Sequence, residues 1–285
     1  MTTQAPTNVP PIGDWNRLLD QRVAVVTGGG EGIGAAIARL FAEHGALVEI
    51  AEVDGERAAR VAASIGGAGG SARAHVLDVT DDDSVAAFAL DVLATHGRVD
   101  VIVNNVGDYR PLVRFPESTP ESWKAMYDIN LRHVFAVTHA FIGSMIEQGS
   151  GSIVNIHSVE GMRGYPGDPV YGAMKAAVAH FTTCLAVGLG RNGIRVNGIG
   201  PDLTQTPQVD YLAGSEQSEP LWPSWAPVGR LGWPEDQARA ALFLASDLSS
   251  FVTGHNIPVD GGTKAGSGWF YSPAAHRFTN RPTTL

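Results

Sequence analysis

Short apolar runs alternate along the chain with longer stretches in which apolar residues recur at helical spacing. The short runs are apolar on both faces, which is typical of strands that helices cover on both sides of a parallel sheet. The predicted strands are Val23–Thr27, Leu47–Ala51, Arg73–Leu77, Val99–Val103, Ser152–His157, Arg195–Ile199 and Asn256–Val259. The predicted helices are Gly34–His44, Glu56–Ser64, Asp81–Thr95, Pro120–Glu147, Val170–Arg191 and Pro234–Ala245. This alternation predicts one α/β domain of the Rossmann type, a doubly wound parallel sheet of about seven strands with helices on both faces.

Three segments do not follow the alternation. Residues 1–20 open with a Pro-, Thr- and Asn-rich stretch and are predicted to form an N-terminal arm. The Pro- and Trp-rich excursion Asp202–Gly232 interrupts a Rossmann-type domain predicted over residues 21–263. The tail, residues 264–285, contains the run Trp269–Tyr271, which is too apolar for a freely solvated segment. We expect this tail to dock on its own or a neighbouring subunit.

Acidic residues outnumber Lys and Arg by 29 to 20, which gives a formal net charge of −9. This balance argues against nucleic acid and anionic membranes as partners. The N-terminus shows neither the basic nor the apolar region of a secretory signal. The most apolar long stretch, Tyr171–Gly190, contains Lys175 and His180, which favours a buried or subunit-facing helix over a membrane span. We therefore expect a cytoplasmic protein.

Cysteine and histidine give little sign of chemistry of their own. The single cysteine, Cys184, excludes an internal disulfide and fits a reducing compartment. It lies in the apolar run Phe181–Leu189, so a buried, inert thiol is expected rather than a catalytic one. The nine histidines form no close ligand pair on one helix, and no metal site is predicted.

The first predicted strand leads directly into a glycine-rich turn, which a predicted helix follows. Glycines let the chain turn sharply and let a pyrophosphate approach a helix N-terminus, where free N–H groups favour anions. The spacing is Gly-x-x-x-Gly-x-Gly, and a glycine cluster alone also fits a tight structural turn. The order of strand, turn and helix favours a dinucleotide site. The predicted cofactor-binding residues here are Gly28, Glu31, Gly32, Ile33 and Gly34.

Glu52 follows the second predicted strand, about where a dinucleotide fold presents an acid to the adenosine ribose. A 2′-phosphate would meet the negative charges of Glu52 and Glu31, and no Arg or Lys lies between Gly28 and Ile33 or directly after Glu52. NAD is therefore the predicted cofactor in preference to NADP. The alternative for Glu52 is a solvated carboxylate at a strand end.

Three further residues point to proton transfer. Tyr171 and Lys175 lie four residues apart on a predicted helix and hence on one face, and Ser158 follows the fifth predicted strand. Ligands of doubly wound sheets bind outside the carboxyl ends of the strands. An ammonium nearby would lower the pKa of the phenol, so that Tyr171 could exchange the proton of an alcohol while Ser158 binds the substrate oxygen. Taken singly, these residues also fit an interfacial Tyr, a snorkelling Lys and a strand-end Ser.

In order and spacing, the chain resembles the classical short-chain dehydrogenase/reductase family over about Gln21–Gly262. The resemblance is carried by the Thr27–Gly34 turn, Asn104-Asn105-Val106-Gly107, Asn130, Ser158, Tyr171 and Lys175. It implies reversible, metal-free hydride exchange between a nicotinamide cofactor and a carbinol or carbonyl carbon. It also implies a homotetramer built partly through the Pro120–Glu147 and Tyr171–Arg191 helices, and the apolar breadth of the second agrees with such a contact.

The resemblance assigns a role to each matching residue. Asn130 would hold a water in a proton relay from Lys175 to solvent. The implied catalytic residues are thus Asn130, Ser158, Tyr171 and Lys175. The implied cofactor contacts are Asp78 and Val79 on the adenine, Asn104 on the adenosine ribose side, Tyr171, Lys175 on the nicotinamide ribose, and Leu203 and Thr206 on the carboxamide. Two positions depart from the family pattern: Val106 stands for Ala, and Asp202 stands for Gly in the segment that leads to Leu203.

Substrate identity should depend on Asp108–Phe115, Glu160–Asp168 and Asp202–Gly232. The last of these carries Tyr211, Leu221, Trp222 and Trp225 among prolines. A stiff aromatic loop over a cleft would exclude water, which favours a bulky hydrophobic secondary alcohol or ketone, such as a cyclic, terpenoid, steroid or aryl compound. The alternative is a local mini-core or a subunit contact.

The leading prediction is an NAD-dependent secondary-alcohol dehydrogenase. A 3-oxoacyl-thioester reductase would share the same catalytic set, and NADPH preference or a basic docking face for an acidic carrier would favour it. A nucleotide-binding regulator without turnover is a third alternative, and such a protein is expected to lack one of Ser158, Tyr171 or Lys175. All three residues are present.

Overall fold

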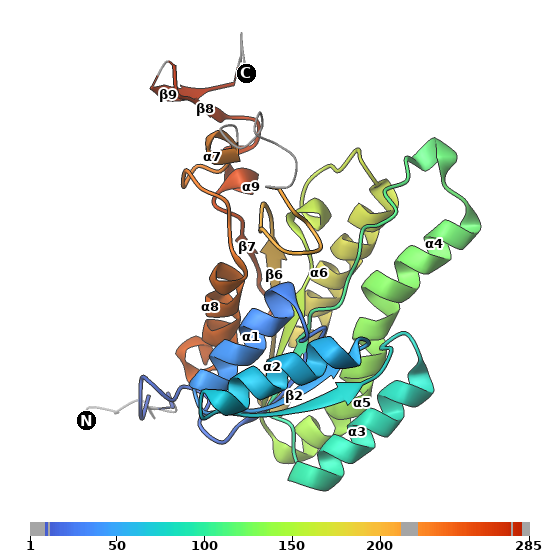
Figure 1. Ribbon diagram of the computed structural model, residues 1–285, viewed down its shortest axis with the longest axis vertical. Helices are drawn as coiled ribbons and strands as arrows, with labels where there is room; N and C mark the ends of the chain where they lie inside the picture. Colours follow the sequence, from blue (N-terminus) through green and yellow to red (C-terminus); the bar gives the residue numbers. More distant parts are fainter. Residues whose placement is uncertain (1–8, 11, 212–221, 275, 281–285) are drawn as a thin grey trace, which may run out of the picture.

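The computed structural model describes residues 9–10, 12–211, 222–274 and 276–280. Seven parallel strands form one sheet in the order β3-β2-β1-β4-β5-β6-β7 (Figure 1). They are β1 (Val23–Thr27), β2 (Leu47–Glu52), β3 (Ser71–Val76), β4 (Val101–Asn104), β5 (Gly151–Ile156), β6 (Ile194–Pro201) and β7 (Asn256–Val259). The winding direction reverses between β1 and β4, and ligands of such sheets bind in the crevice at that reversal. The predicted doubly wound α/β fold is confirmed.

Helices cover both faces of the sheet. One layer contains α1 (Gly32–Glu43), α2 (Gly55–Gly67) and α8 (Pro234–Ala245). The other contains α3 (Asp82–His96), α5 (His133–Gln148) and α6 (Pro169–Leu189). Three shorter helices are α4 (Pro120–Tyr127), α7 (Trp222–Trp225) and α9 (Thr263–Gly266).

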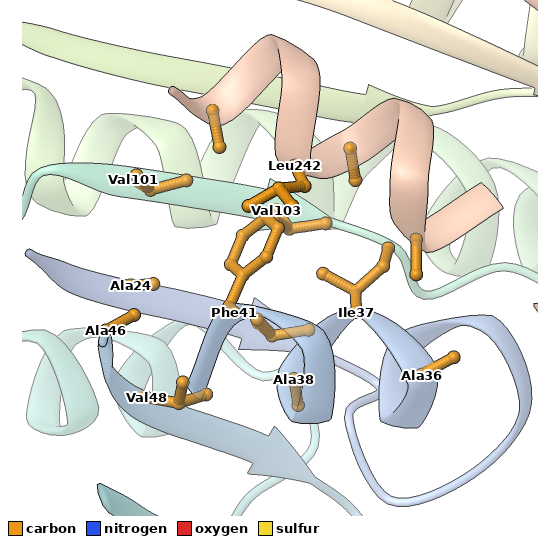
Figure 2. Close-up of a cluster of buried hydrophobic side chains, with 14 of the residues drawn as sticks. Ala24, Ala36, Ile37, Ala38, Phe41, Ala46, Val48, Val101, Val103 and Leu242 are labelled. Atoms are coloured by element: carbon orange, nitrogen blue, oxygen red, sulfur yellow. The ribbon is translucent and has the colours of Figure 1, made fainter. Parts of the chain in front are cut away.

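The core under the first helical layer is built from small residues around a few large ones. Phe41 and Ile37 of α1 are fully buried and lie against Leu242 of α8 and Val103 of β4 (Figure 2). Alanines fill the rest of the inward face of α1, so the helix approaches the sheet closely. This close packing fixes the N-terminal end of α1, which faces the crevice.

The long helix predicted over Pro120–Glu147 is interrupted in the structure. A π-helical turn, η2 (Asp128–Arg132), lies between α4 and α5. A π-turn adds one residue to the helical repeat, which apolar periodicity over a long window does not detect. The interruption places Asn130 inside the protein, with no exposed surface.

The N-terminal arm is shorter than the sequence predicts. Leu19 is fully buried in the core beside α1, and its N–H donates to the carbonyl of His44 at 3.0 Å. Leu18 and Leu19 form a two-residue apolar run ahead of the first strand, which is too short to show a periodicity, so the burial of Leu19 was not predictable from pattern alone. Residues 1–8 and 11 of the arm lie outside the described part of the chain.

The C-terminal tail forms a small antiparallel pair, β8 (Phe270–Ser272) and β9 (Arg277–Thr279). Figure 1 shows this pair beside α7 and α9, at the end of the molecule remote from α3 and α5. The ring centroids of Phe270 and Trp225 are 6.4 Å apart, and those of Tyr271 and Phe278 are 5.5 Å apart. The tail therefore contacts its own chain through α7.

Helix α6 is apolar along most of its length, and the structure shows where this helix and its cysteine lie. By length and composition, Pro169–Asn192 could cross a membrane. In the structure this helix packs on β6 and carries Tyr171 and Lys175. Cys184 on α6 is exposed, so the predicted burial of its thiol is wrong for the single chain. The apolar run that suggested burial faces outward at that position, because α6 has apolar residues on more than one face.

Candidate active site

A cleft of about 750 Å³ opens at the carboxyl ends of the strands. Most of the predicted site residues line it. These are Gly28, Glu31, Gly32, Ile33, Glu52, Asp78, Val79, Ser158, Tyr171, Lys175, Leu203 and Thr206. Three predicted residues, Gly34, Asn104 and Asn130, are not part of the lining.

The glycine-rich turn has a conformation that requires glycine. Gly28 and Gly32 have φ values of +63° and +54°. A Cβ at Gly34 would lie 2.1 Å from the carbonyl oxygen of Gly28, so this glycine permits the turn to pack on the helix rather than contacting a ligand. No side chain caps the N-terminus of α1, and its free N–H groups suit a pyrophosphate.

Glu52 is held rigidly at the edge of the cleft. Its carboxylate accepts hydrogen bonds from the backbone N–H groups of Gly30 at 3.0 Å, Val53 at 3.1 Å and Asp54 at 3.2 Å. The side chain is 8% exposed. A carboxylate so placed suits the two hydroxyls of an adenosine ribose.

Arg57 is a cleft residue that the sequence reasoning missed. It lines the same end of the cleft as Glu52, and its guanidinium lies 3.0 Å from the carboxylate of Glu31. Arg57 lies five residues beyond Glu52, too far along the chain for sequence proximity to place it at the ribose end. The N-cap at Asp54 starts α2 there, and the first turn of that helix brings Arg57 back to the cleft.

The catalytic candidates come from β5 and α6. Asp168 caps α6 by accepting from the N–H groups of Val170 and Tyr171 at 3.0 and 3.1 Å. This cap fixes the start of the helix, so Tyr171 and Lys175 project from one face. The Lys175 Nζ lies 5.7 Å from the centroid of the Tyr171 ring and donates to the Ile156 carbonyl at 3.4 Å.

The family model described as enoyl-(acyl carrier protein) reductase matches residues 28–264. A 3-oxoacyl-[acyl-carrier-protein] reductase FabG from Chlamydia muridarum is 42% identical, over 87% of this chain and 99% of its own length. A cis-4-hydroxycyclohexanecarboxylate dehydrogenase from Sinomonas cyclohexanicum is also 42% identical, over 86% of this chain and 97% of its own. The structure of a 7α-hydroxysteroid dehydrogenase, solved with NADH and 7-oxo glycochenodeoxycholic acid, matches with a TM-score of 0.82 at 32% identity, over 88% of this chain and 98% of that one.

The chain belongs to the short-chain dehydrogenase/reductase family. It is accordingly an oxidoreductase that binds a nicotinamide dinucleotide. The residues present fit such a coenzyme, because the glycine turn at the uncapped N-terminus of α1 and the carboxylate of Glu52 line one cleft at the carboxyl ends of the strands.

The pKa of the Tyr171 phenol is shifted in the direction opposite to the one the sequence predicts. Burial raises the pKa of the Tyr171 phenol, while its hydrogen bond with Ser158 acts in the opposite direction. Burial lowers the pKa of Lys175 to about 8, against the charge of Asp108. Desolvation of the phenol therefore outweighs the lowering of its pKa that we expected from Lys175. The spacing of the two residues along a helix does not reveal how deeply the phenol is buried.

Two asparagines brace the site from beneath. The Nδ2 of Asn104 donates to Asn155 at 2.8 Å and to Thr138 at 3.0 Å, so this side chain lies under the cleft floor. Asn105 lines the cleft in its place and donates to the carbonyls of Thr27 and Gly28 at 3.0 and 3.2 Å. The Asn104 side chain therefore does not line the cleft, and its expected contact with the adenosine ribose stays a prediction.

The Asn130 side chain is fully used by backbone groups. Its Nδ2 donates to the Asp108 carbonyl at 2.7 Å and to the Met126 carbonyl at 3.2 Å, while its Oδ1 accepts from the Asp108 N–H at 3.1 Å. Asn130 therefore clamps the segment after β4. A relay water on this residue would bind its main-chain carbonyl rather than its amide.

Tyrosines line the substrate end, and two of them lie in segments that the sequence analysis assigned to substrate recognition without singling out these residues. The ring centroids of Tyr109 and Tyr165 lie 6.2 and 6.1 Å from that of Tyr171, and Tyr211 also lines the cleft. Trp225 does not line it and contacts the tail instead, as the mini-core alternative expected. Leu221 and the Trp222 side chain lie outside the described part of the structure.

Asp202, the departure from the family pattern, joins three segments. Its carboxylate accepts from Arg163 at 2.9 Å and from the Thr263 hydroxyl at 2.6 Å. Arg163 also donates to Glu160 at 2.6 Å. The loop after β6, which carries Leu203 and Thr206, is thereby tied to the segment before α6 and to α9.

Proposed function

We propose that this protein is an NAD-dependent oxidoreductase that transfers hydride reversibly between NAD and a secondary alcohol or ketone borne on a hydrophobic ring. One observation carries the proposal: the Tyr171 phenol lies in one cleft with Ser158 and Lys175, and the rings of Tyr109 and Tyr165 are about 6 Å from its own ring. Flat aromatic walls beside the proton-transfer group suit a ring-shaped apolar substrate.

The chain's own groups would handle the proton. Ser158 and Tyr171 would bind one substrate oxygen between them. In ketone reduction Tyr171 donates its proton to that oxygen, which its raised pKa suits, because the phenol holds the proton until the oxygen becomes basic. In alcohol oxidation Tyr171 accepts the proton, and the Lys175 ammonium one helical turn away stabilises the phenolate. Bound NAD would supply the carbon that exchanges hydride with the substrate.

Each end of the coenzyme has matching residues. The N-terminus of α1 would hold the pyrophosphate, Glu52 the adenosine ribose, and Asp78 and Val79 the adenine. Leu203 and Thr206 would contact the carboxamide and Lys175 the nicotinamide ribose. NAD is favoured over NADP because two carboxylates, Glu31 and Glu52, line the ribose end and Arg57 is paired with Glu31. The NADH in the similar 7α-hydroxysteroid dehydrogenase structure supports the same choice.

Reduction of a 3-oxoacyl thioester is the second candidate, because the FabG relative is as similar as the cyclic-alcohol relative. The charges at the substrate end weigh against an acidic carrier. Arg110 is paired with Asp108, and Arg163 is paired with Glu160 and Asp202. The cations there are thus neutralised by neighbouring acids.

Tyr171→Phe tests the assignment. We expect kcat with a cyclic alcohol or ketone to fall about 10²- to 10⁴-fold, while the Kd for NADH changes by less than about threefold. The assay is coenzyme absorbance with cyclohexanol, a hydroxysteroid and acetoacetyl thioester, each with NAD(H) and NADP(H). Retained turnover in the variant would remove Tyr171 from its role, and activity confined to the thioester with NADPH would establish the second candidate.

We also propose that the enzyme works in the cytoplasm as a homotetramer. The support is the unpaired, exposed Cys184 and the apolar outer faces of α5 and α6.

A further inference from the structure

A buried histidine, His157, lies directly after β5, between two residues that face the catalytic groups. The Ile156 carbonyl accepts a hydrogen bond from Lys175, and Ser158 is hydrogen-bonded with Tyr171. His157 lies between them, 3% exposed, and its Nδ1 is 3.0 Å from the Ser158 carbonyl oxygen. No step of the proposed mechanism uses this imidazole.

Two glycines of β6 form a cradle for the ring. A Cβ at Gly198 would lie 2.9 Å from Cδ2 of His157, and a Cβ at Gly200 would lie 2.8 Å from Cε1. The backbone N–H of His157 donates to the carbonyl of Ile199, the residue between the two glycines, at 2.9 Å. A side chain at position 200 would displace the ring, and one at position 198 would collide with both the ring and the Asn256 Oδ1, at 2.2 Å from the latter.

The surroundings select one tautomer of the ring. Ser158 offers a carbonyl, which only accepts, so Nδ1 must carry the proton. Nε2 has no hydrogen-bond partner among the described residues. Burial lowers the pKa of His157 to about 4, with the charge of Lys175 acting in the same direction, so the ring is neutral at ordinary pH.

We propose that His157 is a positioning residue, whose Nδ1–H holds the Ser158 carbonyl and so sets the direction of the Ser158 hydroxyl toward the substrate oxygen. The inference rests on the proposed function. The ring packs tightly against β6, so it has little freedom to move. Its hydrogen bond therefore holds Ser158, which would contact both Tyr171 and the substrate, in a fixed position. A shift of about 1 Å in such a group is enough to slow a reaction about 10²-fold.

Asparagine and leucine at position 157 separate the hydrogen bond from packing, because the two side chains have nearly the same size. Asparagine places an amide donor at the branch point where histidine has Nδ1, and leucine places none. We expect His157→Leu to lower kcat about 10- to 100-fold with the KM and the NADH Kd nearly unchanged. His157→Asn should recover kcat to within about threefold of the unaltered enzyme.

The cradle gives a second, independent test. Gly200→Ala should lower kcat in the unaltered enzyme by displacing the ring, and should have less than a twofold effect in the His157→Asn background, where Cε1 is absent. Gly66→Ala on α2, where a Cβ would meet nothing within 4 Å, is the matched control. Equal losses for the Asn and Leu variants, or no loss for Leu, would overturn the proposal.

A spectroscopic measurement works without turnover. In protein with ¹⁵N-labelled histidine, we expect one neutral ring protonated at Nδ1, unchanged from about pH 5.5 to 9 and absent from the His157→Asn spectrum. An Nε2–H tautomer, or a ring that titrates in that range, would contradict the inference even if the enzyme is active. Conversely, inactivity of Tyr171→Phe with normal activity of His157→Leu would leave the proposed function standing and reject the positioning role.

Discussion

Three charged side chains bear on the proposed preference for NAD over NADP. Glu31 and Glu52 place negative charge at the ribose end, and Arg57 lies there as well. The guanidinium of Arg57 is 3.0 Å from Glu31 and 3.4 Å from Asp54, so its charge is already neutralised. The proposed preference for NAD would therefore depend on the ion pair between Glu31 and Arg57 as much as on repulsion between Glu52 and a 2′-phosphate.

Glu31→Gln combined with Glu52→Ser should release Arg57 to pair with a 2′-phosphate. We expect the ratio of kcat/KM for NAD to that for NADP to fall about 10- to 100-fold, which corresponds to about 1.4 to 2.8 kcal/mol. Adding Arg57→Met should restore most of the discrimination. A ratio that the arginine substitution leaves unchanged would show that repulsion alone sets the preference.

Buried histidines should make the protein sensitive to acid. His133 on α5 has no exposed surface, and burial lowers its pKa to about 3, with the charge of Lys175 acting in the same direction. The unfolded chain takes up protons near pH 6.5 at His133 and His157, whereas the folded protein does not. The unfolded state then binds more protons, so stability is present above about pH 6.5 and is lost as pH falls toward 4.

His133→Leu should make the protein less sensitive to acid. Between about pH 6.5 and 5.5, one such histidine contributes about 1 kcal/mol to the loss of unfolding free energy, and the variant should lack that contribution. Urea unfolding of both proteins at the two pH values measures the difference. An equal acid-induced loss in the variant would mean that His133 becomes protonated in the folded state.

The sequence predicts side chains well where local spacing alone determines their position. Tyr171 and Lys175 share a face because they are four residues apart on a helix, and the structure places both in the cleft. Asn104 and Asn105 are neighbours at the end of β4. Which of the two side chains faces the cleft depends on the residue at which the strand ends, and local spacing does not determine that residue. Tyr109 and Tyr165 reach Tyr171 from loops whose paths depend on tertiary contacts.

Among the larger elements, strands were predicted within a few residues. The five inner strands are buried along most of their length and give continuous apolar runs, whereas the edge strands β3 and β7 are less buried. Helix ends were less certain, and the π-turn η2 was not predicted at all. The loop after β6 shows why loops resist prediction. Its Leu203 has a φ of +41°, and the residue before it, Asp202, is fixed by Arg163 and Thr263 from distant segments.

Asp202→Gly tests what this junction does for the site. Removing the carboxylate releases the loop that carries Leu203 and Thr206, so we expect the KM for both coenzyme and substrate to rise about fivefold, equivalent to about 1 kcal/mol, with a smaller change in kcat. Thr263→Val removes only one of the hydrogen bonds and should have a smaller effect. Steady-state kinetics decide the question, and an Asp202→Gly enzyme with unchanged KM values would show that the loop is held by other contacts.

At the scale of the whole molecule, the sequence predicts the single sheet because seven apolar runs and the helices between them leave few topologies. The resemblance and the apolar breadth of Tyr171–Arg191 point to a subunit contact on the second helical layer, but they do not say which side chains lie on its outer surface. On that surface the rings of Phe135 on α5 and Phe181 on α6 lie 4.7 Å apart, and Val187 of α6 is 82% exposed. Cys184 precedes Val187 by three residues and shares its face. An exposed apolar strip across two helices is typical of an interface between copies of one chain.

Val187→Glu should disrupt that interface. Burying a charge between two apolar helix faces costs more than the contact gains, so we expect light scattering at micromolar concentration to give a tetramer for the unaltered protein and a smaller species for the variant. Cys184 reports the same event, because its thiol should react with a disulfide reagent at least about tenfold faster once the face is open to solvent. Leu90→Glu, at an equally exposed apolar position on α3, is the control and should change neither the mass nor the thiol rate. If the unaltered protein were already monomeric with a fully reactive Cys184, α5 and α6 would not be the assembly face.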